Sequence, residues 1–145
     1  MVAYCALLME KPMKIIQEGY ALTITDQLIT VINTEIKKSG LNVSEGLILS
    51  FRDDDYSAEK GGYHPVEISI NYQGKILYIT DFAYVGQGYY AELEKEIDFD
   101  LFLGLMQHMG REFPIEQGYE LFGIWQQNFC AYYEQGVYQV TVTPS

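Results

Sequence analysis

Hydrophobic and polar positions alternate most clearly between Pro65 and Tyr84, where two runs rich in β-branched and aromatic residues flank the segment NYQG, residues 71–74. Asn at the first position of this segment and Gly at the fourth suit a type I turn followed by a residue with positive φ, a conformation that costs glycine little. Residues 65–84 are therefore predicted to form a β-hairpin with a three-residue, bulged loop.

The bulged loop also predicts which residues of the hairpin face one another. It pairs Ile70 with Ile76, Ile68 with Tyr78 and Val66 with Thr80. Asp81 then lies on the opposite face, with Leu77 and Ile79. A two-residue loop at Gln73-Gly74 would instead bring Ile68, Ile70, Leu77 and Ile79 together, because a slip of one residue exchanges the two faces of an arm. The bulged loop is preferred, since Gln adopts positive φ poorly.

Three segments have apolar residues at helical spacing. Residues 26–38 follow a potential N-cap at Thr25 and end at Gly40. Residues 99–112 follow Asp98 as a cap and end before Pro114, and residues 119–134 end before Gly136. Residues 92–100 are rich in carboxylates and are expected to form a short solvated helix. If they formed a strand instead, their carboxylates would line one face.

The remaining pattern indicates strands and loops. Residues 43–52 and 137–143 alternate as strands, 13–17 could form a short strand, and 53–64 form a long polar loop. The apolar run 2–9 is too short to span a bilayer and is expected to dock on the core. Together these elements predict a single α+β domain over residues 1–145, with a curved antiparallel sheet built around the hairpin 65–84 and helices packed on it.

Composition and charge narrow the classes of partner. The chain has 145 residues and a formal net charge of −11, which disfavours binding to nucleic-acid phosphates or to an anionic membrane and leaves basic proteins or cations open. Cys5 and Cys130 are far apart and belong to no metal-binding motif, so both are expected to be free thiols in a reducing cytoplasm. No cofactor is expected.

Two short motifs resemble nucleotide-enzyme signatures. Residues 86–91, GQGYYA, match the form of a dinucleotide fingerprint, but they follow a hairpin arm and precede an acidic stretch, where pyrophosphate would be repelled. We interpret these glycines as parts of a tight turn. The pattern of Tyr56 and Lys60, which resembles a reductase motif, lies in the predicted loop and is attributed to chance.

The candidate site residues are few. His64 precedes the first hairpin arm, and it could pair with Asp81 if the strand ends bring the two together. Such a histidine–carboxylate pair is one part of the arrangement that general base catalysis requires. Asp53, Asp55 and Glu59 are weak candidates for a divalent cation, because the loop lacks the glycine and bidentate glutamate of an EF-hand. His108 is expected to be a surface or packing residue on its helix.

The middle of the chain resembles a known family. The strand ending YITDFAYVG, with the carboxylate-rich stretch that leads to DFD, lies within residues 68–100. These features are similar to a small uncharacterised bacterial family of domains of unknown function, of mobile-element or gene-cassette type. The resemblance implies an α+β domain of bacterial origin and implies no catalytic residue.

The leading hypothesis is a non-enzymatic cytoplasmic accessory or binding protein, because the chain contains no complete catalytic set. It would act as a homodimer through a tyrosine-rich surface that includes Tyr84, Tyr89 and Tyr90. The alternative is a small-molecule-binding domain or enzyme with a pocket at the sheet that uses Asp81 and His64. A third idea is an acidic decoy that occupies a DNA-binding protein and carries a continuous stripe of carboxylates.

Overall fold

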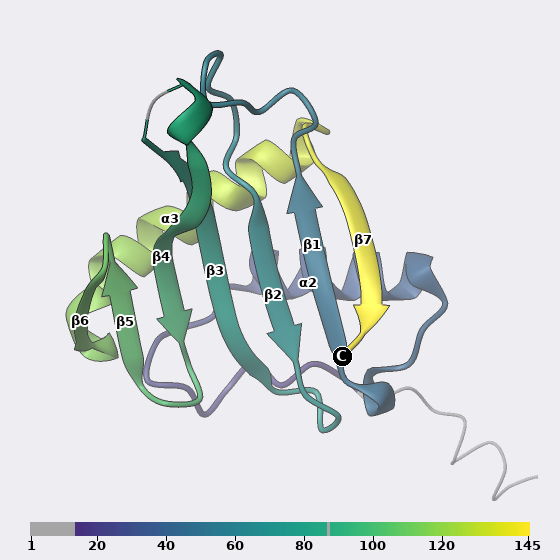
Figure 1. The fold of residues 1–145 in the computed structure, drawn as a ribbon. Coiled ribbons are helices and arrows are strands. Elements are labelled where there is room, and N and C mark those ends of the chain that lie inside the picture. Colours follow the sequence, from purple (N-terminus) through teal and green to yellow (C-terminus); the bar gives the residue numbers. More distant parts are fainter. Residues whose placement is uncertain (1–13, 87) are drawn as a thin grey trace, which may run out of the picture.

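The computed structural model describes residues 14–86 and 88–145. A seven-stranded sheet in the order β6-β5-β4-β3-β2-β1-β7 carries helices α2 and α3 on one face, and all its strand pairs are antiparallel (Figure 1). The predicted α+β class, with the hairpin at the centre of the sheet, is confirmed. None of the helices in the described ranges is long and apolar enough to cross a membrane.

The elements have the following bounds: α2 Asp26–Ser39, η1 Val43–Glu45, β1 Leu47–Arg52, β2 Val66–Ile70, β3 Ile76–Val85, η2 Gly88–Tyr90, β4 Glu92–Asp100, β5 Leu105–His108, β6 Arg111–Pro114, η3 Ile115–Gly118, α3 Tyr119–Glu134 and β7 Gln139–Pro144. The two helices and β7 agree with the prediction. Thr25 caps α2 by accepting a hydrogen bond from the N–H of Leu28, and Gly40 ends it with φ of 72°.

The hairpin forms with the predicted turn but with a different register beyond it. Gly74 has φ of 85°, and Ile70 faces Ile76 as expected. A second bulge next to this pair then shifts the register, so Ile68 faces Ile79 rather than Tyr78, and Val66 faces Asp81 rather than Thr80. The shift buries Ile79 completely, because an extra residue re-aims the side chains that follow it. Asp81 consequently shares a face with Val66.

The helix predicted over 99–112 is wrong, and so is the short helix over the acidic stretch. Residues 92–100 form β4, and the following residues form the β5–β6 hairpin. Gly104 and Gly110 adopt φ of 72° and 81°, which suits tight turns and interrupts a helix. Asp98 is not a cap: it lies in β4, and its Oδ1 accepts a hydrogen bond of 2.6 Å from the Thr80 hydroxyl. Pairing with β3 outweighs the local helical spacing.

Two strand predictions need a smaller correction, and the predictions for the first residues of the chain lie outside the residues that the structure describes. The strand predicted over 43–52 begins at Leu47, because Val43–Glu45 form a 3₁₀ turn. Residues 14–17 of the short strand predicted over 13–17 are not a strand. Residue 13, the segment 2–9 and Cys5 lie outside the described residues, whereas Cys130 is a free, buried cysteine.

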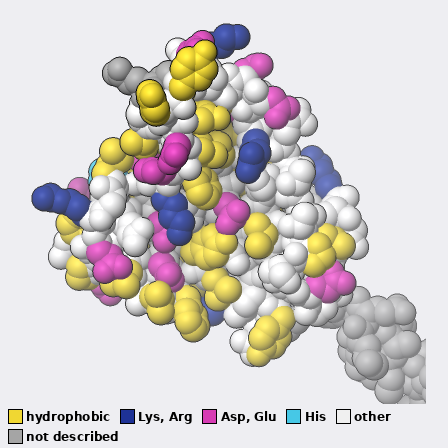
Figure 2. All heavy atoms as spheres, in the orientation of Figure 1, with side chains coloured by type: hydrophobic (Ala, Val, Ile, Leu, Met, Phe, Trp, Pro, Cys, Tyr) yellow, Lys and Arg dark blue, Asp and Glu magenta, His cyan; other side chains and the backbone are white. Residues whose placement is uncertain are grey.

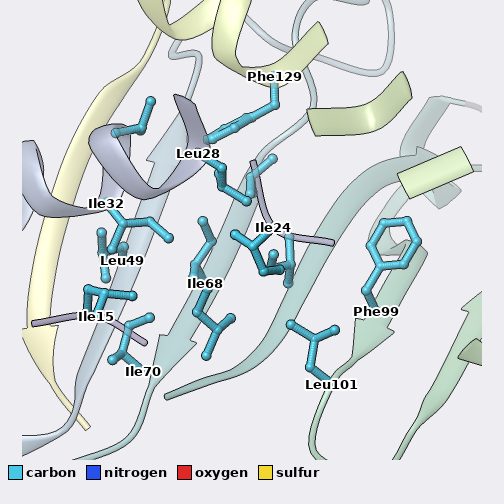
Figure 3. Close-up of a cluster of buried hydrophobic side chains, with 14 of the residues drawn as sticks. Ile15, Ile24, Leu28, Ile32, Leu49, Ile68, Ile70, Phe99, Leu101 and Phe129 are labelled. Atoms are coloured by element: carbon cyan, nitrogen blue, oxygen red, sulfur yellow. The ribbon is translucent and has the colours of Figure 1, made fainter. Parts of the chain in front are cut away.

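The core lies between the sheet and the two helices. In Figure 3, Leu28 and Ile32 of α2 and Phe129 of α3 lie against Leu49 of β1 and Ile68 of β2. Four of these five side chains are completely buried, and Phe129 is 2% exposed. Burying such side chains is the main favourable contribution to folding. The core therefore fixes how α3 lies over the sheet, and with it the position of the site described next.

Candidate functional site

The structure brings His64 and Asp81 together at one end of the sheet. His64 lies two residues before β2, and Asp81 lies on β3 opposite the first residue of β2. The Nδ1 atom of His64 lies 2.9 Å from Oδ1 of Asp81. The two side chains therefore make the contact that the sequence suggested. The register shift in the hairpin contributes to it, because it places Asp81 on the same face as Val66.

A third residue, Glu96, completes the cluster. Its Oε2 lies 2.8 Å from the same Nδ1 atom of His64. The β3–β4 register changes between Asp81 and Phe82, whose partners are Ile97 and Lys95, so Glu96 is the extra residue of a bulge. Bulges re-aim side chains and are common beside functional sites. Here the bulge lies where Glu96 meets a histidine that comes from the loop before β2.

The electrostatics of the cluster favour a charged imidazole. The hydrogen bond to Asp81 is the largest cause of a raised pKa at His64, the charges of Asp81 and Glu96 act in the same direction, and partial burial opposes them. Asp81 is also fixed from the helix side, because its Oδ2 accepts a hydrogen bond of 3.0 Å from the indole N–H of Trp125. Both oxygens of Asp81 therefore have defined partners.

A cavity of about 300 Å³ adjoins His64 and Asp81. Its aromatic walls come from the loop before β2, from α3 and from the residue before β7: Tyr63, Trp125, Phe129, Tyr132 and Tyr138. Asn128 of α3 adds an amide. Burial is the largest cause of a raised pKa at Tyr138, so its phenol stays neutral and can donate a hydrogen bond. This combination of aromatic walls and a few polar groups is typical of ligand pockets.

The loop that carries His64 is held in place by Asp53. The Oδ2 atom of Asp53 accepts a hydrogen bond of 3.0 Å from the Tyr63 N–H, and its Oδ1 accepts one of the same length from the Asp55 N–H. Gly62, which precedes Tyr63, has φ of 129°, and a Cβ there would lie 2.9 Å from Oδ2 of Asp53. The geometry therefore assigns Asp53 to loop positioning.

The weak cation candidates do not converge. Within the described residues, the one group of three side chains whose potential metal-ligating atoms all lie within 4.8 Å of one another is His64, Asp81 and Glu96. This group includes none of Asp53, Asp55 and Glu59. His108, expected on a helix, is instead exposed at the end of β5.

The predicted tyrosines lie away from the cavity. Tyr84 stacks on Tyr56, with ring centroids 5.1 Å apart, and the ring of Tyr56 lies 5.4 Å from the His64 ring. Tyr89 and Tyr90 belong to η2 and project into solvent, with relative exposures of 104% and 86%. Tyr84 thus supports the loop near His64, whereas Tyr89 and Tyr90 have their rings in solvent.

Gly86 of the glycine-rich motif has a turn conformation, in agreement with the interpretation from the sequence. Gly86 has φ of 96°, and β4 follows η2 where a dinucleotide fold would place a helix. A Cβ at Gly86 would lie 2.7 Å from the carbonyl oxygen of Tyr90. The glycine thus permits a close approach of two backbone segments.

A second concavity of about 340 Å³ lies against residues 17–26. Its walls come from one continuous segment, and the Gln17 amide already donates to the Asp26 carboxylate (2.7 Å) and the Ile24 carbonyl (2.9 Å). The cavity beside His64 is the stronger candidate, because four separate parts of the chain build it.

Sequence reasoning missed Glu96, Trp125 and the cavity tyrosines Tyr63, Tyr132 and Tyr138. Glu96 was assigned to a helix, although the strand alternative for residues 92–100 would have placed it on a defined face. Trp125 was recognised only as part of an apolar helix face. The sequence contains a single tryptophan, and its indole N–H needs a partner when buried, which was the available signal.

Comparisons with known proteins give a family without an assigned activity. The model of a family described as proteins of unknown function (DUF2787) matches residues 26–143. A hypothetical protein from the VSP-II pathogenicity island of Vibrio cholerae is 34% identical, with a TM-score of 0.77, over 88% of this chain and 99% of its own. A conserved hypothetical protein from the VPI-2 island of the same species is 32% identical, with a TM-score of 0.75, over 87% of this chain and 98% of its own. The search among curated proteins found no significant match.

Proposed function

We propose that this chain, which belongs to the DUF2787 family of proteins of unknown function, binds a small neutral or cationic molecule in the cavity beside His64 and Asp81. The identification of an uncharacterised bacterial family from the sequence is confirmed. The observation that carries the proposal is the convergence of His64 and Asp81 on the wall of an aromatic cavity.

The charge of the cavity sets the class of ligand. Its lining, all within the described ranges, includes Asp81 and contains neither Lys nor Arg. A phosphate or carboxylate ligand would therefore meet the carboxylate of Asp81, while His64, the side chain of the lining that can carry a positive charge, already contacts Asp81 and Glu96. A cation over the faces of Trp and Tyr gains about 0.5–2 kcal/mol from the ring quadrupoles. The volume of about 300 Å³ is at the lower end of the range for ligand pockets, which favours a compact, planar molecule.

Free polar groups are available to orient such a ligand. Among the hydrogen bonds within residues 14–86 and 88–145, none involves the hydroxyls of Tyr63, Tyr132 or Tyr138, or the amide of Asn128. In the same part of the chain, no fully buried side-chain polar atom lacks a partner. These four groups are therefore accessible to solvent or to a ligand, next to the aromatic walls.

Three isosteric probes test the proposal: benzamidine, benzamide and benzoate, which carry positive, zero and negative charge on the same ring. Isothermal titration calorimetry should show binding in the order benzamidine, then benzamide, then benzoate. Tyr132→Ala, which removes a cavity wall, should weaken benzamidine binding, whereas Tyr72→Ala, at an exposed position on the hairpin turn, should not. Equal binding of all three probes, or equal effects of the two substitutions, would overturn the proposal.

A second candidate function is association through the aromatic surface formed by Tyr84, Val85, Tyr89, Tyr90 and Leu93, all of which are exposed. Figure 2 shows hydrophobic side chains gathered at the upper end of the molecule, over the ends of β3 and β4. We propose that this surface serves the homodimer predicted from the sequence. Light scattering after size exclusion should show a dimer that Tyr89→Ser with Tyr90→Ser converts to monomer; a monomer at high concentration without these changes would contradict it.

The decoy hypothesis receives less support. On the face shown in Figure 2, carboxylates are interspersed with Lys, Arg and hydrophobic side chains. Along β4, Leu93 separates the exposed Glu92 and Glu94, and the exposed Lys95 lies between Glu94 and Glu96. A basic protein partner remains a prediction from the net charge of −11.

A further inference from the structure

We propose that His64, Asp81 and Glu96 form a binding site for one divalent cation of the first transition series. The inference deepens the proposed function, since His64 and Asp81 also line the cavity and the cation would lie at its edge. The site would supply one imidazole nitrogen and two carboxylate oxygens.

The donor set selects the class of cation. Nδ1 of His64, a carboxylate oxygen of Asp81 and one of Glu96 all lie within 4.8 Å of one another. An imidazole nitrogen suits Zn²⁺ and its neighbours, whereas Mg²⁺ and Ca²⁺ prefer oxygen ligands alone. The two carboxylates together match the charge of a divalent cation.

The arrangement of acceptors also favours a cation. Oδ1 of Asp81 and Oε2 of Glu96 lie 2.9 Å and 2.8 Å from the same Nδ1 atom. A single N–H can point at only one of these oxygens with good geometry, because hydrogen bonds weaken steeply away from linearity. A cation between the three atoms would satisfy both carboxylates and the imidazole at once.

Outer contacts hold the ligands in position, as they do in metal sites generally. The Trp125 indole N–H binds Oδ2 of Asp81 and leaves Oδ1 toward His64. The carbonyl of Glu96 accepts a hydrogen bond of 2.9 Å from the Met109 N–H, which ties the bulge to the turn after β5. Next to His64, the carbonyl of Pro65 accepts one of the same length from the Phe82 N–H. Hydrogen bonds thus hold Asp81, the backbone at Glu96 and the backbone next to His64 in position.

The cluster is accessible but not fully exposed. The side chains of His64, Asp81 and Glu96 are 36%, 14% and 29% exposed. A cation can therefore enter, and three protein ligands leave at least one coordination position for water or a pocket ligand, as in open metal sites.

The test is calorimetric titration of the full, tag-free chain, stripped with a chelator, with Zn²⁺, Mn²⁺ and Mg²⁺. Mn²⁺ is included because the thiols of Cys5 and Cys130 compete for Zn²⁺ far more than for Mn²⁺. One equivalent of Zn²⁺ should bind most tightly and Mg²⁺ most weakly. His64→Gln and Glu96→Gln should each weaken Zn²⁺ and Mn²⁺ binding by at least roughly 10-fold, since even outer-shell changes cost that much.

Glu94→Gln is the matched control, because it removes the same charge from an exposed position on the same strand. Unchanged cation binding in Glu94→Gln supports the site. Equal losses in Glu94→Gln and Glu96→Gln, or no saturable binding of Zn²⁺ and Mn²⁺, would overturn it. Circular dichroism of each variant confirms that it is folded before titration.

The same variants separate this inference from the proposed function. Glu96 is not among the cavity-lining residues, so Glu96→Gln should retain benzamidine binding while it loses the cation. Benzamidine binding without cation binding would refute the metal site alone. Cation binding without benzamidine binding would refute the aromatic pocket alone.

Discussion

Two neighbouring residue pairs of one hairpin have opposite surroundings. Ile68 and Ile79 face each other and are completely buried under the helices. Val66 and Asp81, the pair at the start of β2, two residues before Ile68, line the cavity beside His64. The difference shows that the same β2–β3 register places a hydrophobic pair in the core and, at the next pair on the same face, places a carboxylate at the cavity beside His64. The bulge beside Ile70 thus determines both stability and chemistry.

The buried pair should produce the largest loss of stability when it is truncated. Ile68→Ala removes a fully buried side chain between the sheet and α2, and such changes cost about 2–5 kcal/mol. Urea denaturation followed by circular dichroism measures the free energy of unfolding. A cost below about 0.5 kcal/mol, the range of surface substitutions, would contradict the assignment of Ile68 to the core.

A polar residue that braces α3 should produce the next largest effect. Gln126 is 1% exposed; its Oε1 accepts from the Thr25 N–H, and its amide donates to the Thr23 carbonyl. Gln126→Ala leaves both backbone groups without a partner, at about 1–3 kcal/mol. Gln127→Ala, on the exposed side of α3, is the control, and equal costs for the two would contradict this role.

The loop that carries His64 offers a third test. Gly62→Ala places a side chain at φ of 129° and against Asp53, so the loop must shift. We expect a loss of about 1–3 kcal/mol from backbone strain, together with weaker benzamidine binding. Gly123→Ala is the control, because a Cβ there meets no atom within 4 Å. Unchanged binding in Gly62→Ala would show that the loop geometry does not matter for the cavity.

The smallest effect concerns Asp98 and pH. Burial is the main cause of a raised pKa at Asp98, and the hydrogen bond from Thr80 opposes it. Because the folded state holds this proton more tightly, the contribution of Asp98 to stability is greatest below its ordinary pKa of 3.8 and is lost as the pH rises through the raised value. The melting temperature of Asp98→Asn, relative to the unaltered chain, should therefore rise over that window. A difference independent of pH would contradict the shift.

The comparison also explains which elements were predictable. Helices α2 and α3 have helical spacing that agrees with their packing and are followed by glycines with positive φ, Gly40 and Gly136, and Thr25 caps α2. Residues 99–112 have equally good spacing, but Gly104 and Gly110 supply turns, and Phe99 and Met106 face each other across β4 and β5. Local spacing could not show that β4 offers a pairing edge to residues 105–108. Non-local strand pairing therefore determined the structure there.

The site was only half predictable for the same reason. A contact between His64 and Asp81 could be suggested because the predicted hairpin, residues 65–84, begins just after His64 and ends shortly after Asp81. Glu96 comes from a bulge, and Trp125 reaches Asp81 across 44 residues of chain, so neither contact is visible without the register and the helix position. The cavity depends on four segments brought together by the core.

The most direct test of the central claim uses the indole N–H of Trp125, the only tryptophan in the sequence. This group binds Asp81 and lies at the cavity, so it gives one resolved reporter signal in a ¹H–¹⁵N correlation spectrum. We predict that benzamidine shifts this signal in a saturable manner, and that benzoate at the same concentrations does not. An indole signal that stays fixed while calorimetry shows saturation with benzamidine would place the ligand elsewhere and contradict the account.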